Sequence, residues 1–200
     1  AAVAAISVGS SQVEGFWSVL LNPGSNEIVW QIRFPRVMAA VIVGAGLGIA
    51  GLMAQGACNN AIAEPAILGT AAGASFGAVA GIATGLVQVG SLAALTFGTA
   101  GALLATSITF KLAALRGALS SFNLIIVGIA VSAIFTSFVG ITSAVLNRAD
   151  ARSISFWSLG SLALVTNENL LGLIITTLAG GVIAWFIAPM LDRLSLGDHS

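Results

Sequence analysis

Hydrophobic and polar positions along this chain fall into long blocks. From Arg36 onward, uncharged apolar stretches are separated by short polar links, and each stretch approaches the ~20 residues that a helix needs to cross the hydrocarbon core of a bilayer. A transmembrane β-barrel would need segments of about ten residues with alternating apolar and polar positions, so this pattern predicts helices. We expect five spans, at about 37–57, 66–88, 91–110, 122–146 and 170–188.

The distribution of charge supports the same five spans. All seven basic and all seven acidic residues lie outside them, and an ionisable side chain at mid-bilayer costs about 2.5–3.5 kcal/mol on insertion scales. The predicted fold class is therefore all-α, a polytopic transmembrane helix bundle. Residues 1–8, AAVAAISV, are too short to span and lack the basic start of a signal peptide. We expect them to be the end of one further span.

The links between the spans have distinct compositions. Residues 9–36 form a polar connection that contains the turn signature NPGS. The link CNNAIAEP follows the first span, and its Pro65 suits the first turn of the next helix. The stretch 147–169 mixes apolar and polar residues around Phe156 and Trp157, which predicts an amphipathic segment at the membrane interface.

Small residues recur every fourth position in the second span. Because no hydrophobic force drives helices together inside lipid, close backbone approach at such residues supplies much of the packing. The first span carries Gly44 and Gly48 at the same spacing. The predicted helix-packing stripe of the second span consists of Gly73, Gly77, Gly81 and Gly85.

The chemistry-bearing residues exclude several classes of function. The single Cys58 can form no intrachain disulfide and is expected to be a small buried residue, and the single His199 predicts no metal site. The sequence GLGIAG at 46–51 fits a dinucleotide-binding pattern but lies inside a span, and the only lysine, Lys111, follows Phe110 and cannot complete a phosphate loop. No catalytic set and no basic, aromatic-rich face for nucleic acid occurs. We expect neither enzymatic activity nor nucleic-acid binding.

Three hydroxyl residues fall roughly on one face of the fourth span: Ser132, Thr136 and Ser143. Such hydroxyls often bond the carbonyl four residues earlier, which would make them purely local. The alternative is that they line a neutral, weakly polar path for a large solute. Ion-coupled transporters usually carry ionisable residues at membrane depth, and these spans have none.

Counting basic residues does not decide the orientation. Alternating connections place four on one side and three on the other, too even a division for the positive-inside rule. The first group is Arg33, Arg36, Arg148 and Arg152, and the second is Lys111, Arg116 and Arg193. Within the first group, Arg148 and Arg152 are expected to pair locally with Asp150.

Three pieces of the sequence resemble the iron-chelate and cobalamin type (FecCD-like) permeases of binding-protein-dependent ABC importers. They are WQIRFPR at 30–36, NNAIAEPAILG at 59–69 and RSISFWSLGSL at 152–162. The second is similar to the family's N-P-L-A-E/D-P-x-x-L-G and is the most specific, and the third to R-x-x-x-F-W-L-x-G-S-L. Asn60-Ala61 replaces the family's Asn-Pro, which predicts a less rigid turn. The resemblance covers essentially the whole chain. The chain has about three-fifths of the length of a usual family member, which has about ten spans.

The resemblance implies an orientation and a docking site. Members of the family have a cytoplasmic N-terminus, so 9–36 is expected outside the cytoplasm, while 189–200 begins the cytoplasmic loop that contacts the ATPase. Arg33 and Arg36 would then pair with glutamates of the substrate-binding protein, contacts that set register and encounter rate. The alternative is that both are snorkelling interfacial arginines.

The resemblance also assigns residues to the cytoplasmic end. Ser120, Ser121 and Phe122 correspond to the family's cytoplasmic gate, and Asn59 and Asn60 lie near the same end. The expected ATPase contact consists of Leu194, Ser195, Leu196, Gly197 and Asp198.

The function implied is that of a transmembrane permease subunit in the inner membrane of a prokaryote. A permease pair, of two copies or of paralogues, would carry an iron chelate, meaning a ferric siderophore or haem, by alternating access. Two partner ATPases would bind ATP and Mg, so this chain itself needs no cofactor. Cobalamin is the close alternative as cargo. An ATP-independent channel or secondary transporter, and a non-transporting scaffold, are the alternatives from other classes.

Overall fold

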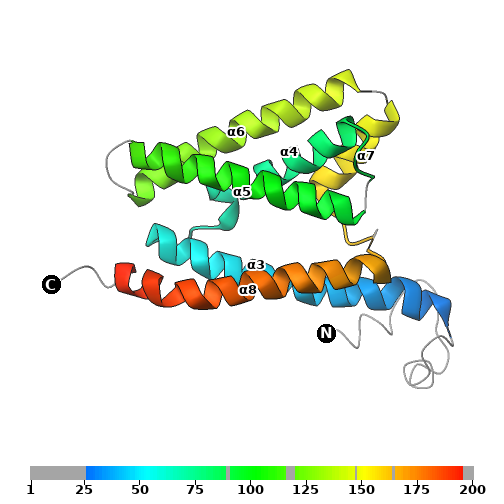
Figure 1. The fold of residues 1–200 in the computed structure, drawn as a ribbon, viewed down its shortest axis with the longest axis horizontal. Coiled ribbons are helices and arrows are strands. Elements are labelled where there is room, and N and C mark those ends of the chain that lie inside the picture. The colour runs from blue at the N-terminus through cyan, green and yellow to red at the C-terminus, as the bar shows by residue number, and fades with distance from the viewer. Residues whose placement is uncertain (1–25, 89–90, 116–119, 147, 164, 196–200) are drawn as a thin grey trace. The chain divides into compact units, whose positions relative to one another are not determined.

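The computed structural model describes residues 26–88, 91–115, 120–146, 148–163 and 165–195, and these form helices and turns. The turn signature at 22–25 and the expected span end at 1–8 lie outside the described residues. The described residues divide into two units. The first contains the residues up to Leu47 together with Leu162–Val182, and the second contains Gly48–Ser161 together with the residues from Ile183 on. Two helices of Figure 1, α3 and α8, run through both units.

Four helices have the length and apolar composition to cross a membrane, which agrees with the predicted all-α polytopic bundle. The first is a π-helical stretch, η1 (Ile28–Arg33), that continues directly into α3 (Phe34–Cys58). The others are α5 (Leu92–Leu115), α6 (Ser121–Val145) and α8 (Asn167–Ser195). The first helix therefore begins earlier than expected, and residues 28–36 of the predicted polar connection are helical.

The second expected span, 66–88, is not one continuous helix. It consists of a 3-10 turn, η2 (Pro65–Leu68), followed by α4 (Thr70–Ala83), which has 14 residues. Gly69 separates them in the left-handed conformation, with φ of 84°. At 1.5 Å per residue α4 is about 21 Å long, less than the ~30 Å of a hydrocarbon core. The apolar run correctly located a helix here but overestimated its length, because Gly69 interrupts the helix and α4 ends at Ala83.

The expected interfacial segment contains α7 (Arg148–Leu159), a helix of 12 residues that includes Phe156 and Trp157. Its Ile154 is 1% exposed and belongs to a core cluster with Val79 and Ile82 of α4. Gly160 ends α7 with φ of 72°. The helix is therefore anchored on the end of α4, as Figure 1 shows.

Close contact between α4 and α5 forms the centre of the second unit. Gly73 lies against the Gly101 carbonyl and the Ala105 side chain, and Gly77 lies against the Phe97 carbonyl, so that a methyl group at either glycine would overlap them. Gly81 is similarly enclosed by Val87 and Phe97. These three glycines of the predicted stripe lie in the helix contact.

Gly85 was also assigned to the helix-packing stripe, and here the prediction is wrong. α4 ends at Ala83, and Gly85 follows it with φ of 73° and no atom near the position of a Cβ. Its role is to turn the chain after the helix, because glycine adopts a positive φ without the strain that other residues incur.

We expect Gly77→Ala to lower the stability of the bundle and Gly48→Ala to leave it unchanged or raise it. The Cβ at 77 would meet the Phe97 carbonyl, and overpacking of this kind costs roughly 1–3 kcal/mol. A Cβ at 48, also within a helix, meets nothing within 4 Å, and alanine favours helix over glycine by about 1 kcal/mol. Thermal unfolding in detergent measures both, and equal melting temperatures would contradict the described α4–α5 contact.

Candidate functional site

The candidate docking residues lie where η1 passes into α3: Arg33 ends η1, and Arg36 is in the first turn of α3. Asn26 caps the start, its Oδ1 accepting from the Ile28 and Val29 amides at 3.1 and 3.3 Å. Arg33 and Arg36 follow on adjoining turns of one helix face, because residues three apart are neighbours on a helix surface. Arg33 is half-buried and Arg36 is exposed. The structure thus brings the two arginines together.

Arg36 also has a partner within the protein. Its Nη2 donates to the carbonyl of Ala163, in the link between α7 and α8, at 2.8 Å. Close by, the Asn167 side chain donates to the Trp30 carbonyl at 3.3 Å. These two bonds join the start of α3 to the segment before α8. Arg36 therefore has a structural role whether or not it also meets a partner protein.

At its other end, α3 terminates in a Schellman motif formed by Asn59 and Asn60. Asn59 has φ of 43° and its amide donates to the Gly56 carbonyl at 3.2 Å, while the Asn60 amide donates to the Gln55 carbonyl at 3.0 Å. These two bonds satisfy carbonyls that the helix leaves without partners, and asparagine tolerates the left-handed conformation better than most residues. The candidate gate asparagines are thus the helix cap.

The Asn60 side chain organises the next turn as well. Its Oδ1 accepts from the Ile62 amide at 3.0 Å, and its carbonyl accepts from the Ala63 amide at 3.0 Å. An asparagine side chain bonded two residues ahead reproduces a backbone turn. One side-chain bond and one backbone bond thus close the turn, with Ala61 at the position where the family pattern has proline.

The break between η2 and α4 is enclosed by neighbouring helices. The Thr109 hydroxyl of α5 donates to the Leu68 carbonyl at 3.0 Å, and the Thr70 hydroxyl donates to the Pro65 carbonyl at 2.7 Å. On the α6 side, Gly128 lies directly against the Ile67 carbonyl. Irregular backbone within a membrane protein is tolerated where protein surrounds it, and these contacts meet that condition.

Ser120 is the N-cap of α6. Its hydroxyl accepts from the Asn123 amide at 3.2 Å, and its carbonyl accepts from the Leu124 amide at 3.0 Å. Ser121 begins the helix, and Phe122 is 71% exposed. Ser120 thus has a local structural role, whereas the phenyl ring of Phe122 is largely exposed.

The two candidate gate segments border one core cluster. Cys58 and Ala63, on either side of Asn59 and Asn60, are buried in it, as are residues near the end of α5 and the start of α6. The burial expected for Cys58 is therefore confirmed, at 1% exposed. The full cluster is Cys58, Ala63, Leu68, Ala105, Ala113, Leu124, Val127, Val131 and Phe135.

The hydroxyl face expected on the fourth span is only partly open. Ser132 is half-buried, with its Oγ 3.6 Å from where a Cβ of Gly69 would lie, whereas Thr136 is exposed and Ser143 is half-buried. Ser132 therefore borders the break before α4.

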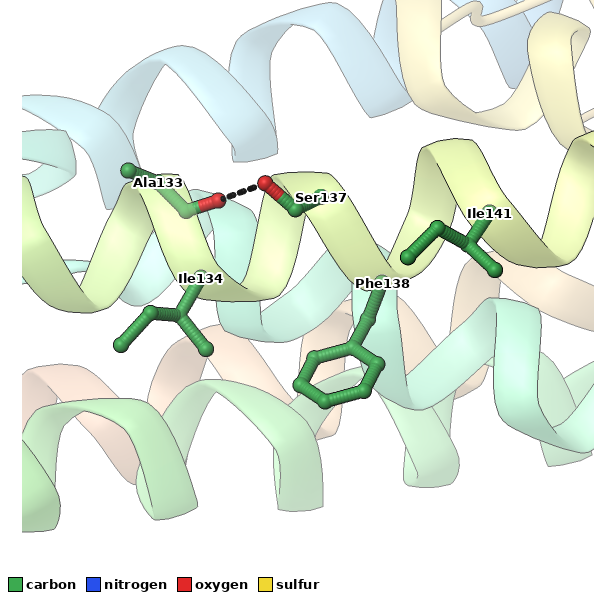
Figure 2. A pocket seen from close by; sticks show the side chains of 5 residues that line it. All are labelled: Ala133, Ile134, Ser137, Phe138 and Ile141. Carbon is green, nitrogen blue, oxygen red and sulfur yellow. Dashed lines mark hydrogen bonds between the residues drawn. The ribbon is translucent and has the colours of Figure 1, made fainter.

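A shallow hollow of about 270 Å³ lies on another face of α6 (Figure 2). Ile134, Phe138 and Ile141 give it an apolar lining, and Ser137 bonds back to the Ala133 carbonyl at 2.7 Å. The Phe138 ring also lies 5.9 Å from the Phe76 ring of α4. Its lining offers neither a charge nor an uncommitted hydroxyl, and nothing in it would orient a ligand.

Some predicted residues lie outside what the structure describes. Leu196, Gly197 and Asp198 of the expected ATPase contact fall beyond the described range, and for Leu194 and Ser195 it gives only the helical backbone at the end of α8. The expected pairing of Arg148 with Asp150 likewise depends on undescribed side chains. Within the described ranges, no cluster of three or more His, Cys, Asp or Glu residues could hold a metal ion.

Sequence reasoning missed Thr109, Gly101 and Gly128. All three lie within the predicted apolar spans, but the sequence does not show which carbonyl of another segment each of them contacts. The carbonyls that they contact belong to other helices or to the link.

The helices and the enclosed break define a multi-pass α-helical membrane protein. The chain belongs to the FecCD transport family, which it matches over residues 1–200. This family and the apolar helices place it in a bacterial cell membrane.

Two relatives are permeases of import systems. The chain is 36% identical over 178 residues to the iron(3+)-hydroxamate import system permease protein FhuB of Bacillus subtilis (strain 168), covering 87% of this chain and 45% of that protein. It is 34% identical over 146 residues to the vitamin B12 import system permease protein BtuC of Escherichia coli (strain UMN026), covering 73% and 43%. The chain thus spans less than half the length of either relative.

A solved structure has the same fold. It is described as an inward-facing conformation of a candidate metal-chelate type ABC transporter, and it matches with a TM-score of 0.79 and 26% identity. The match covers 98% of this chain and 61% of that one. The arrangement of helices is therefore one that a transporter chain adopts.

We expect Ala61→Pro to stabilise the protein and Ile62→Pro to destabilise it. Proline is favoured at the second position of a turn such as 60–63, and it restricts the unfolded chain, an effect worth about 0.4–1 kcal/mol. At position 62 it would remove the amide that donates to Asn60 Oδ1. Both side chains are exposed, so thermal unfolding reports the backbone effect. A lower melting temperature for Ala61→Pro would contradict the described turn.

Proposed function

We propose that this chain is part of the permease subunit of an ABC importer that carries an iron chelate, a ferric siderophore or haem, into the cytoplasm. The observation that carries the proposal is the match to the FecCD transport family over residues 1–200. The identity with an iron(3+)-hydroxamate permease supports iron chelates, and the identity with a vitamin B12 permease makes cobalamin the second candidate.

The mechanism proposed is alternating access driven by partner ATPases, which would bind ATP and Mg. Cargo released by an extracytoplasmic binding protein would enter between two permeases, and the cytoplasmic gate would open on the other side. In this scheme Arg33 and Arg36 guide the binding protein, and Asn59, Asn60 and Ser120–Phe122 form the gate. Leu194–Asp198 would meet the ATPase.

The described helices support a neutral path. Arg33 and Arg36 lie near the start of the α3 helix, and Lys111 is near the end of α5. A path of apolar and hydroxyl groups suits a bulky, coordinated cargo whose charge the chelator masks. An ATP-independent secondary transporter would instead use ionisable groups at depth.

Uptake into proteoliposomes tests the function. The permease in its full length is reconstituted with its ATPase, the binding protein is added outside, and radiolabelled ferric hydroxamate siderophore, haem and cobalamin are compared. We expect uptake of one of these only when ATP, the ATPase and the binding protein are all present. Equal uptake without ATP or without the ATPase would contradict the proposal and favour a channel or secondary transporter.

The double variant Arg33→Glu/Arg36→Glu tests the docking role. Reversing both charges is expected to slow association with the binding protein about tenfold or more and to invert the salt dependence of the rate. Charge pairs at an interface steer encounter, and salt screens the repulsion that the reversed charges create. Surface plasmon resonance at two salt concentrations measures this. Lys111→Glu, a reversal in a different helix, is the matched control.

Arg36→Gln separates docking from the bond to Ala163. Glutamine retains an N–H donor but has no charge, so the melting temperature should stay closer to wild type than in Arg36→Glu while association still slows. Unchanged association in both Arg36→Gln and the double reversal would show that the arginines only stabilise the helix end.

A further inference from the structure

Thr109 uses its hydroxyl differently from its neighbours on α5. Within the residues that the structure describes, it is the one fully buried polar side chain, at 0% exposed. Its hydroxyl donates to the Leu68 carbonyl, 41 positions away in the chain. Thr99 and Thr106 instead donate to carbonyls one turn back on α5 itself, at 2.8 Å each. The Thr109 bond therefore joins α5 to η2, whereas the bonds of Thr99 and Thr106 stay within α5.

The carbonyl that Thr109 holds lies at the break in the chain. Leu68 ends η2 and Gly69 follows in the left-handed conformation, so the helix α4 does not supply the Leu68 carbonyl with a partner. Gly128 packs against the preceding carbonyl of Ile67, and Val131 lies 3.3 Å from where a Cβ of Gly69 would be. The end of η2, which follows the link, is thus held by α5 on one side and α6 on the other.

The same two helices carry the other candidate gate segment. Thr109 lies six residues before Leu115, about 9 Å along the helix axis from the α5 end. Leu124 of α6, one turn after Ser120, is buried in the cluster that also contains Cys58 and Ala63. A displacement of the α5 end therefore reaches the link through the Thr109 bond and through the shared core.

We infer that Thr109 is a positioning residue that fastens η2, and with it the turn that follows Asn59–Asn60, to α5. The two candidate gate segments, Asn59–Asn60 and Ser120–Phe122, would then move as one unit. The inference rests on the proposed function. Without the bond, the link could relax independently of α5, and closing one segment would no longer close the other. ATP would then be hydrolysed without a matching amount of cargo transported.

Three variants isolate the hydroxyl. Thr109→Val removes it at nearly constant volume, and Thr109→Ser retains it. Thr106→Val removes a hydroxyl from the same helix whose bond is local. Should Thr109→Val not accumulate, Gly128→Ala displaces the link from the α6 side, because its methyl group would overlap the Ile67 carbonyl.

Two measurements on the full-length transporter test the inference. Spin labels at Ala61→Cys and Leu115→Cys, both exposed positions, report the distance between link and α5 in a background with Cys58→Ala and no other cysteine. We expect a broadened distance distribution in Thr109→Val alone. In proteoliposomes, ferric hydroxamate uptake per ATP hydrolysed should fall several-fold in Thr109→Val, with Thr109→Ser and Thr106→Val near wild type.

The outcomes separate the inference from the proposed function. An unchanged distance distribution in folded Thr109→Val overturns the positioning role, whatever the uptake. A broadened distance distribution with normal uptake per ATP hydrolysed overturns the claim that this positioning is needed for coupled gating. If the wild type takes up no ferric hydroxamate, haem or cobalamin, the proposed function fails, and the distance measurement still decides whether Thr109 fastens the link.

Discussion

Backbone polar groups inside a membrane need partners within the protein, and the break at Pro65–Gly69 is where this requirement is most demanding. Three carbonyls there have specific neighbours: that of Pro65 accepts from its own Thr70, that of Leu68 accepts from Thr109, and that of Ile67 packs against Gly128. The candidate gate segments border the core cluster that also contains Leu68, so they lie close to this break.

Glycine makes this arrangement possible by letting backbones approach. Gly73 and Gly77 on α4 and Gly101 on α5 remove the side chains that would otherwise hold the two helices apart. With hydrocarbon outside, helix association depends on such packing and not on burial of apolar surface away from water. A short α4, tightly held by α5 and α6, can then begin deep in the bundle and still be stable.

The long apolar runs predicted the helices because charge is excluded from hydrocarbon whatever the tertiary structure. The break in the second run was not predictable, since Gly69 reads as one more glycine and its positive φ depends on contacts with α5 and α6. Gly85 was wrongly assigned to the packing stripe because the sequence likewise does not show that its φ is positive. The resemblance singled out the asparagines only as residues near the cytoplasmic gate, because their capping bonds and the bond of Thr109 depend on how the chain folds.

Hydrogen–deuterium exchange of the reconstituted protein tests most directly whether the break is enclosed and satisfied. The account predicts that the amides of Ile67, Gly69 and Gly73, which donate to the carbonyls of Glu64, Ala66 and Gly69, exchange as slowly as those in the middle of α5. Ala61 and its neighbours in the exposed turn should exchange quickly. Exchange at these three amides as fast as in the turn would contradict the account, because the break would then be open to water and could not hold the gate segments in place.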